Sequence, residues 1–274
     1  MKLSFLTIGD KNFFPYISFS IYQLNKLYLF PTIVVYDVGF TNVQKKRLKK
    51  NDNVIIIDWL NLKKSFPISI NPISFLKRRL YGSKLLDYRR ECLLAQKPYI
   101  FKHWNKINPH SGFIFLDGDA IIIKKFDTEP FFNKITFTIR QNEELNFNKR
   151  SCAVINSGVI FFCDKRTIND KILDKWCKRM YKTNEKLVEQ SALTRLLVDQ
   201  VGNEGCFYRS DYPILQEGLD FTFNLQCCID YNYYWLDETD KFLEAKIIHF
   251  KKSRRTQTFL NTVIQKIDSN YISN

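Results

Sequence analysis

The segment that decides the fold reads Phe113-Ile114-Phe115-Leu116-Asp117-Gly118-Asp119-Ala120-Ile121-Ile122-Ile123. Apolar, strand-forming residues lie on both sides of the Asp-Gly-Asp, so the two carboxylates interrupt buried structure rather than a wet surface loop. Charged groups in such a place must be paired or metal-bound. Two carboxylates one residue apart suit a hard divalent cation that is shared with a substrate diphosphate. A simple turn, for which Asp and Gly also supply the chemistry, is the alternative.

Three apolar stretches on the N-terminal side have the composition of buried strands: Leu3–Ile8, Thr32–Tyr36 and Val54–Ile57. Between the first two, Tyr16–Leu29 places apolar residues at helical spacing, and between the second two, Val43–Lys50 has the pattern of a short basic helix. Strands that alternate with helices indicate a mostly parallel central sheet flanked by helices. The predicted fold class is therefore α/β, with a Rossmann-like domain.

The same alternation continues toward the C-terminus. A helix is predicted over Leu85–Asn105, with a kink or restart at Pro98 because proline interrupts the helical hydrogen bonds. Three further strands are expected at Ile135–Arg140, Val154–Phe162 and Ala245–Phe250. Two further helices are expected at Ile168–Tyr181 and Glu189–Val198. No repeat or linker divides the chain, so we predict one domain over residues 1–255 and a C-terminal helix and tail over residues 256–274.

Composition narrows the class of protein. The chain has 274 residues, of which 45% are hydrophobic, so it can bury a substantial core. No stretch approaches the roughly 20 apolar residues needed to cross a bilayer, and the N-terminus does not have the pattern of a signal peptide. The seven cysteines show no C-x-x-C spacing, which favours reduced thiols. We therefore expect a cytoplasmic protein.

The formal net charge of +14 favours a polyanionic partner, which could be nucleic acid, anionic lipid headgroups or a phosphorylated substrate. A basic surface without a specific partner is the alternative. The segment Lys251–Lys266 combines basic with apolar residues, so it is a candidate for peripheral association with the anionic inner face of a membrane. Packing of this helix on the body of the protein is the competing interpretation.

Four polar positions lie near or just after the ends of predicted strands, and ligands of doubly wound α/β folds bind at the carboxyl ends of the strands. These positions are Gly9-Asp10, Asp37, the Asp-Gly-Asp and His249. A histidine on an apolar strand is often only a core residue. An imidazole beside two carboxylates, however, suits Mn²⁺ better than Ca²⁺.

Eight short motifs occur in a recognisable order across nearly the whole chain: Ile8-Gly9-Asp10-x-Asn12-Phe13, Tyr36-Asp37-Val38-Gly39, Tyr88-x-Arg90, Asp117-x-Asp119, Asn156-Ser157-Gly158-Val159, Glu189-Gln190-x-x-Leu193, Phe223-Asn224 and Ile247-Ile248-His249-Phe250. In this order they resemble the metal-dependent, nucleotide-sugar-using glycosyltransferases related to glycogenin and the bacterial lipooligosaccharide galactosyltransferases. The resemblance implies the fold known as GT-A.

The resemblance also implies roles for individual residues. Asp117, Asp119 and His249 would bind Mn²⁺ (or Mg²⁺), which acts as a Lewis acid on the leaving diphosphate. Glu189 and Gln190 would orient the sugar and stabilise an oxocarbenium-like transition state. The residues expected to bind the nucleotide sugar are Ile8, Asp10, Asn12, Phe13, Arg90, Gly118, Asn156, Gly158, Lys252 and Arg255.

Two of the motifs depart from the family pattern. The family's terminal motif continues H-x-x-G-x-x-K-P-W, whereas here Lys252 stands at the glycine position and Arg255 at the lysine position. Arginine can bind phosphate bidentately, but the backbone turn that glycine permits is put in doubt. Glu189 replaces the usual aspartate and is longer by a methylene.

The expected function is transfer of a hexose from a nucleotide sugar, with UDP implied by the resemblance at Asp10 and Asn12, to a glycan, lipid-linked or protein acceptor. The resemblance implies retention of anomeric configuration. Two alternatives stay open: a nucleotidyltransferase, which would more naturally recruit a second metal, and a basic nucleic-acid-binding protein. The chain lacks an early Walker or Rossmann glycine loop, which disfavours nucleotidyl transfer and ordinary NAD chemistry. It also lacks any zinc-finger, RNP or KH signature, so no nucleic-acid partner is expected.

Overall fold

The computed structural model describes residues 3–62, 94–109, 111–139, 155–182, 188–197, 223–234, 236, 240–251, 256–269 and 271. Its centre is a seven-stranded sheet whose strands, in spatial order, are β3 (Val54–Asp58), β2 (Thr32–Asp37), β1 (Ser4–Gly9), β4 (Phe113–Asp117), β7 (Ile155–Phe162), β6 (Ile135–Ile139) and β8 (Phe223–Cys227). β7 runs antiparallel to both of its neighbours, and the other neighbouring strands pair in parallel. The predicted α/β class with a mostly parallel sheet is confirmed.

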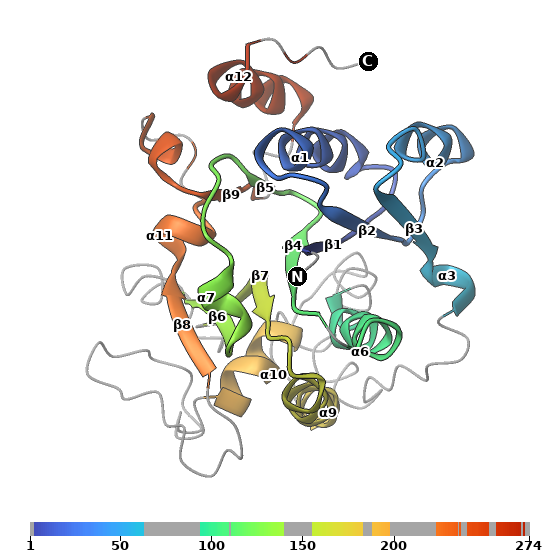
Figure 1. Ribbon diagram of the computed structural model, residues 1–274, viewed down its shortest axis with the longest axis vertical. Coiled ribbons are helices and arrows are strands. Elements are labelled where there is room, and N and C mark those ends of the chain that lie inside the picture. The colour runs from blue at the N-terminus through green and yellow to red at the C-terminus, as the bar shows by residue number, and fades with distance from the viewer. Residues whose placement is uncertain are drawn as a thin grey trace, which may run out of the picture.

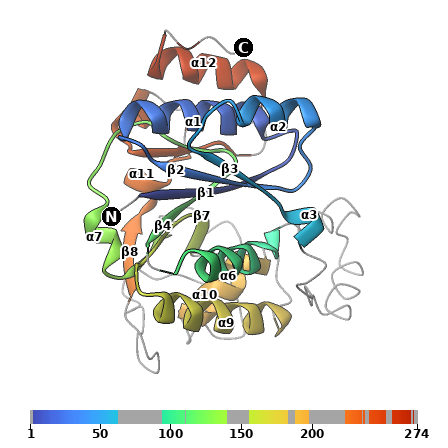
Figure 2. The ribbon, with the colours of Figure 1, turned by 45° about the vertical axis from the view of Figure 1, so that its right-hand side comes forward.

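Helices cover both faces of the sheet (Figures 1 and 2). One face carries α1 (Phe14–Leu27) and α2 (Asn42–Leu48), with α12 (Gln257–Ile267) above α1. The opposite face carries α6 (Lys97–Ile107), α9 (Arg166–Lys182) and α10 (Val188–Leu197). Shorter elements complete the described chain: α3 (Trp59–Leu62), α7 (Glu129–Phe132), α11 (Cys228–Tyr231) and a 3₁₀ turn at Asp240–Glu244.

Alternate residues of the central strands enter different hydrophobic cores, because successive side chains of a strand point to opposite faces. On β1, Leu6 packs with the α6 and α9 side, whereas Phe5 packs with the α1 side. Phe113 and Ile114 of β4 divide in the same way. Both faces are therefore buried, which explains why these strands are continuously apolar.

Local sequence signals explain where several helices begin. Pro98 lies in the first turn of α6, so the helix predicted from Leu85 has a segment that begins at Lys97, and its earlier part lies outside the described residues. Thr41 caps α2 in a capping box with Gln44. The sequence did not predict β5 (Ala120–Ile122), β8, α7 or α11.

The C-terminal helix packs on the body of the protein. Leu260, Val263 and Ile264 of α12 share a core cluster with Tyr16 and Phe19 of α1. At the end of α12, Asp268 accepts a hydrogen bond from the Tyr22 hydroxyl at 2.8 Å and pairs with the Lys26 ammonium at 2.6 Å. Leu260, Val263 and Ile264 are therefore already buried in the protein, and Phe259 and Ile267 are partly buried.

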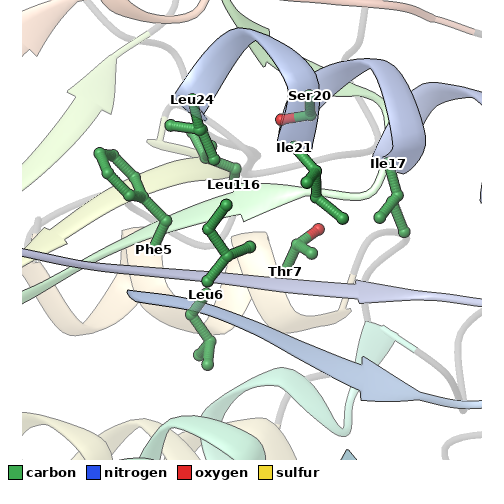
Figure 3. A pocket seen from close by; sticks show the side chains of 9 residues that line it. Phe5, Leu6, Thr7, Ile17, Ser20, Ile21, Leu24 and Leu116 are labelled. Carbon is green, nitrogen blue, oxygen red and sulfur yellow. The ribbon is translucent and has the colours of Figure 1, made fainter. Parts of the chain in front are cut away.

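A small internal void of about 10 Å³ lies between α1 and the underlying strands (Figure 3). It is lined mainly by apolar side chains, including Phe5, Ile17 and Leu116. This volume is about the minimum that holds one water molecule, so the void has no room for a substrate. None of the described helices is long and apolar enough to span a membrane.

Candidate active site

A second, two-stranded sheet brings the Asp-Gly-Asp and His249 together. β5 (Ala120–Ile122) follows Asp119 directly and pairs antiparallel with β9 (Ile247–His249). In this register Ala120 lies opposite His249, and the Phe250 N–H donates to the Asp119 carbonyl at 2.9 Å. Backbone pairing therefore places the histidine beside the second aspartate.

The side chains of Asp117, Asp119 and His249 converge. His249 Nε2 lies 3.2 Å from Asp119 Oδ1 and 3.8 Å from Asp117 Oδ2, and one ligand atom from each residue lies within 4.8 Å of the others. Asp119 and His249 are buried, and Asp117 is partly exposed. Two carboxylate oxygens and an imidazole nitrogen fit a divalent ion that accepts mixed oxygen and nitrogen ligands.

Gly118 allows the loop after β1 to lie against this cluster. A Cβ atom at Gly118 would come within 2.6 Å of the Ile8 carbonyl oxygen and 3.2 Å of Phe13. In the same loop, the Asp10 carboxylate accepts a hydrogen bond from the Asn12 N–H at 2.8 Å. The structure thus brings the first predicted donor-binding motif next to the candidate metal ligands.

Lys97 is a buried cation in the site that the sequence analysis missed. Its ammonium lies 2.7 Å from Asp117 Oδ1, which leaves Oδ2 of the same carboxylate facing His249. Only 5% of the Lys97 side chain is exposed. A sequence signal existed: Lys97 is the first residue of α6, where the helix dipole disfavours a cation. Such a local conflict is typical of functional positions.

Glu189 is a second carboxylate near the Lys97 ammonium. The Glu189 carboxylate is 3.9 Å from the Lys97 ammonium and accepts a hydrogen bond from the Ser157 hydroxyl at 3.3 Å. Its backbone carbonyl accepts from the Trp176 indole N–H at 2.7 Å, which anchors the start of α10. The Glu189 side chain is fully buried, and Gln190 is 8% exposed. Lys97 therefore links this carboxylate to the candidate metal centre.

The predicted strand motif at Asn156 and Gly158 lies directly under His249. A Cβ atom at Gly158 would come within 2.4 Å of His249 Cε1, so only glycine leaves room for the imidazole ring. The Gly158 N–H donates to Asn156 Oδ1 at 3.1 Å. Asn156 Nδ2 is buried and has no hydrogen-bond partner among the described residues, so it is available to a ligand.

Asp37, at the end of β2, has structural partners. Its carboxylate accepts from the N–H groups of Gly39 and Phe40 at 2.8 and 2.7 Å and pairs with Lys45 at 2.6 Å. Burial alone would raise the pKa of Asp37, but the hydrogen bonds from Lys45, Phe40 and Gly39 outweigh it and hold the pKa below its usual value. This carboxylate stabilises the turn after β2.

Three predicted donor-binding residues, Arg90, Lys252 and Arg255, lie outside the described residues. Conversely, the structure reveals Asn232, a fully buried residue beside His249 that the sequence analysis did not identify. Nothing in the sequence around Asn232 distinguishes it from an ordinary loop asparagine.

No protein-family model matches the chain, and no curated protein matches it either. Among solved structures, the bifunctional glycosyltransferase WbbM in its apo form aligns with a TM-score of 0.55 and 12% identity. That alignment covers 97% of this chain and 50% of WbbM, so the chain spans half the length of that protein.

The galactosyltransferase LgtC, in complex with donor and acceptor sugar analogs, aligns with a TM-score of 0.54 and 10% identity. That alignment covers 99% of this chain and 98% of LgtC, and an active-site mutant of LgtC gives the same values. The chain has the fold of these GT-A glycosyltransferases, as the sequence analysis predicted.

Proposed function

We propose that this protein is a metal-dependent glycosyltransferase that moves a hexose from a nucleotide sugar to a glycan, lipid-linked or protein acceptor. The observation that carries the proposal is the convergence of Asp117, Asp119 and His249 within 4.8 Å at the carboxyl ends of β4 and β9. In open α/β sheets, this edge is where ligands bind. Mn²⁺ is the preferred ion because an imidazole nitrogen joins two carboxylates, and Mg²⁺ is the alternative.

The ion would supply Lewis-acid stabilisation of the leaving diphosphate. The protein's own residues would place the donor. Asp10, Asn12, Ile8 and Phe13 lie in or beside the loop that contacts Gly118, so they can hold the nucleoside, for which UDP is our first candidate. Asn156 Nδ2 offers a hydrogen-bond donor on the other side of the cluster. Arg90, Lys252 and Arg255 are proposed to add positive charge near the phosphates.

Glu189 and Gln190 are proposed to act on the sugar. A carboxylate near the anomeric carbon favours the positive charge that develops there as the diphosphate leaves. Lys97 holds Glu189 and Asp117 at a defined separation, because its ammonium contacts both. Retention of configuration is part of the proposal, and we therefore expect the product to have the anomeric configuration of the donor.

Peripheral membrane association is proposed to depend on the basic surface rather than on the apolar residues of α12. Leu260, Val263 and Ile264 are buried against α1, so they would reach a bilayer only after undocking. Each lysine or arginine near an anionic surface contributes about 1 kcal/mol. Sedimentation with anionic and with neutral vesicles separates the two cases, since charge-driven binding disappears with neutral lipid and with added salt.

The proposed function is tested by thermal unfolding with UDP, GDP, CDP and ADP, each with and without Mn²⁺. A ligand at a hundredfold excess over its dissociation constant stabilises the folded state by about 2.7 kcal/mol. We expect a UDP-dependent shift that requires Mn²⁺, is lost in Asp119→Asn and is kept in Asp127→Asn, which changes an exposed carboxylate outside the cluster.

Failure of every nucleotide to shift the midpoint would reject the donor site. Preference for another nucleotide would retain the transferase and change the donor. If UDP binds, release of UDP from a panel of UDP-hexoses would then identify the sugar, with Asp119→Asn as the inactive control.

A further inference from the structure

The His249 ring is held by a chain of buried side chains that the proposed reaction does not use. His249 Nδ1 lies 2.8 Å from Asn232 Oδ1, and Asn232 Nδ2 lies 2.8 Å from the Thr138 hydroxyl. The Thr138 hydroxyl lies 2.8 Å from the Asn156 carbonyl and 3.3 Å from that of Val159. Asn232 and Thr138 are both 0% exposed.

The donors and acceptors in this series of hydrogen bonds can be assigned from its last contact, that of the Thr138 hydroxyl with the backbone carbonyls. A backbone carbonyl only accepts, so the single proton of the Thr138 hydroxyl must be donated to Asn156 or Val159. The hydroxyl oxygen can then only accept from the Asn232 amide, which fixes the NH₂ group toward Thr138. The Asn232 carbonyl oxygen therefore faces His249 and accepts from its Nδ1–H.

We propose that Asn232 and Thr138 are positioning residues that keep Nδ1 of His249 protonated and hydrogen-bonded, so that Nε2 points toward Asp117 and Asp119. In a neutral ring this is the Nδ1–H tautomer, and its unprotonated Nε2 is the nitrogen that can bind a metal. His249 Nε2 lies 3.2 Å from Asp119 Oδ1, so the ring presents this nitrogen to the other candidate metal ligands. The inference deepens the proposed function and rests on it for the role of the ion.

The fold places Asn232 for this task. Tyr233, the next residue, forms an isolated bridge with Ile248, and the His249 N–H donates to the Tyr233 carbonyl at 2.7 Å. Asn232 is thereby fixed to the same strand as the histidine it supports. Thr138 comes from β6, so the chain of hydrogen bonds connects β9 to the central sheet.

The first experiment detects the tautomer without any metal. Long-range ¹H–¹⁵N correlation spectra of the ¹⁵N-histidine-labelled full chain, recorded in mildly alkaline solution, distinguish a protonated from an unprotonated ring nitrogen. The chain has three histidines, and the spectrum of His249→Gln assigns the signal. We expect a protonated Nδ1 in the wild type, its loss in Asn232→Leu and its retention in Asn232→Asp, whose carboxylate still accepts from Nδ1–H.

The second experiment measures the affinity for Mn²⁺ alone, from the electron paramagnetic resonance signal of the free ion. We expect Asn232→Leu to lower the affinity about 10- to 100-fold, as is typical when the outer partner of a metal-binding histidine is lost. Thr138→Val should lower it less, because Asn232 keeps its contact with His249, and Thr138→Ser should retain it. The matched control is Asn105→Leu, which removes another buried asparagine whose partners, including Asp170, lie at α9.

The outcomes separate the two proposals. An unprotonated Nδ1 in the wild type, or wild-type Mn²⁺ affinity in Asn232→Leu, would overturn the positioning role. An equal loss of affinity in Asn105→Leu would show a general loss of stability instead, and would also overturn it. A protonated Nδ1 together with no Mn²⁺ binding by the wild type would refute the metal site of the proposed function and leave the assignment of the Nδ1 hydrogen bond standing.

Discussion

Asp37 and Asp119 are buried to almost the same extent at the same edge of the sheet, yet different groups lie next to them. Asp37 is 2% exposed and is surrounded by donors: two backbone N–H groups and the ammonium of Lys45. Asp119 is 1% exposed and faces an imidazole nitrogen, with a second carboxylate nearby. Burial is nearly equal at the two positions, so it does not separate a structural aspartate from a metal-binding one. The side chains and backbone groups next to the carboxylate decide between these roles.

Substitution of the two aspartates should change Mn²⁺ affinity to very different extents, and this is the largest difference that we expect. Asp119→Asn should lower Mn²⁺ affinity by more than the roughly 100-fold upper range for the loss of an outer partner, because a direct ligand is removed. Asp37→Asn should leave Mn²⁺ affinity unchanged. Titration of free Mn²⁺ by electron paramagnetic resonance measures both, and equal losses in the two variants would break the comparison.

The next largest difference is expected in the stability that is lost when the lysine beside each region is replaced. Lys97 is 5% exposed and lies between Asp117 and Glu189, whereas the Lys45 side chain beside Asp37 is 29% exposed. Removing one partner of a buried ion pair costs about 3–5 kcal/mol, so Lys97→Met should lower the free energy of unfolding by that amount. Lys45→Met should cost about 1 kcal/mol or less, because solvent screens a partly exposed pair. Urea denaturation measures both.

A second substitution sharpens the assignment of the Lys97 effect. Adding Glu189→Gln to Lys97→Met removes the buried negative charge that the first variant leaves behind, so the double variant should regain part of the lost stability. A double variant whose cost equals the sum of the two single costs would show that Lys97 and Glu189 do not interact.

A smaller loss of stability is expected when the carboxylate oxygens of Asp37, which accept hydrogen bonds, are removed. Asp37→Ala leaves the N–H groups of Gly39 and Phe40 without this carboxylate, and unmade buried hydrogen bonds cost about 1–3 kcal/mol. We expect a loss of about 2 kcal/mol in the free energy of unfolding, by urea denaturation. Asp37→Asn keeps an acceptor oxygen and should cost less, and the reverse order would contradict the assigned contacts.

The smallest effect is a change in acid sensitivity. The pKa of Asp37 is lower in the folded than in the unfolded chain, so the unfolded chain takes up the proton first as pH falls. Its contribution to stability is complete above the unfolded pKa, about 3.9, and is lost as pH falls through the folded pKa. Urea denaturation at a series of pH values should show a smaller acid loss in Asp37→Asn than in the wild type, and an unchanged loss in the exposed control Asp127→Asn.

The sequence predicted most described elements because their signals are local. Apolar runs marked β1, β2, β3, β4 and β7, helical spacing marked α1, and Pro98 marked the start of α6. The prediction missed β5 and β8. β5 is only three residues long and exists through its pairing with β9, so its apolar residues alone could not distinguish it from a continuation of the preceding strand.

The candidate site was only partly accessible to sequence reasoning. The Asp-Gly-Asp was visible because charge interrupts an apolar run, and His249 was visible because it ends one. Gly158 was predicted to line the donor, whereas its observed contact is with the His249 ring. Lys97 could have been noticed as a cation at the start of a helix, but its partners Asp117 and Glu189 are distant in sequence. The role of Asn232 was not predictable, since this residue does not stand out by composition or spacing among the other asparagines of the chain.

By itself, the sequence determined the α/β class, the order of the main strands and the polar positions at their carboxyl ends, because periodicity and burial act over neighbouring residues. Only the tertiary structure decided which of those polar groups meet. Asp119 and His249 are 130 positions apart and come within 3.2 Å through the pairing of β5 with β9. Hydrogen bonds and ion pairs act over a few ångströms, so the difference between Asp37 and Asp119 arises when the chain has folded and each carboxylate has acquired its neighbours.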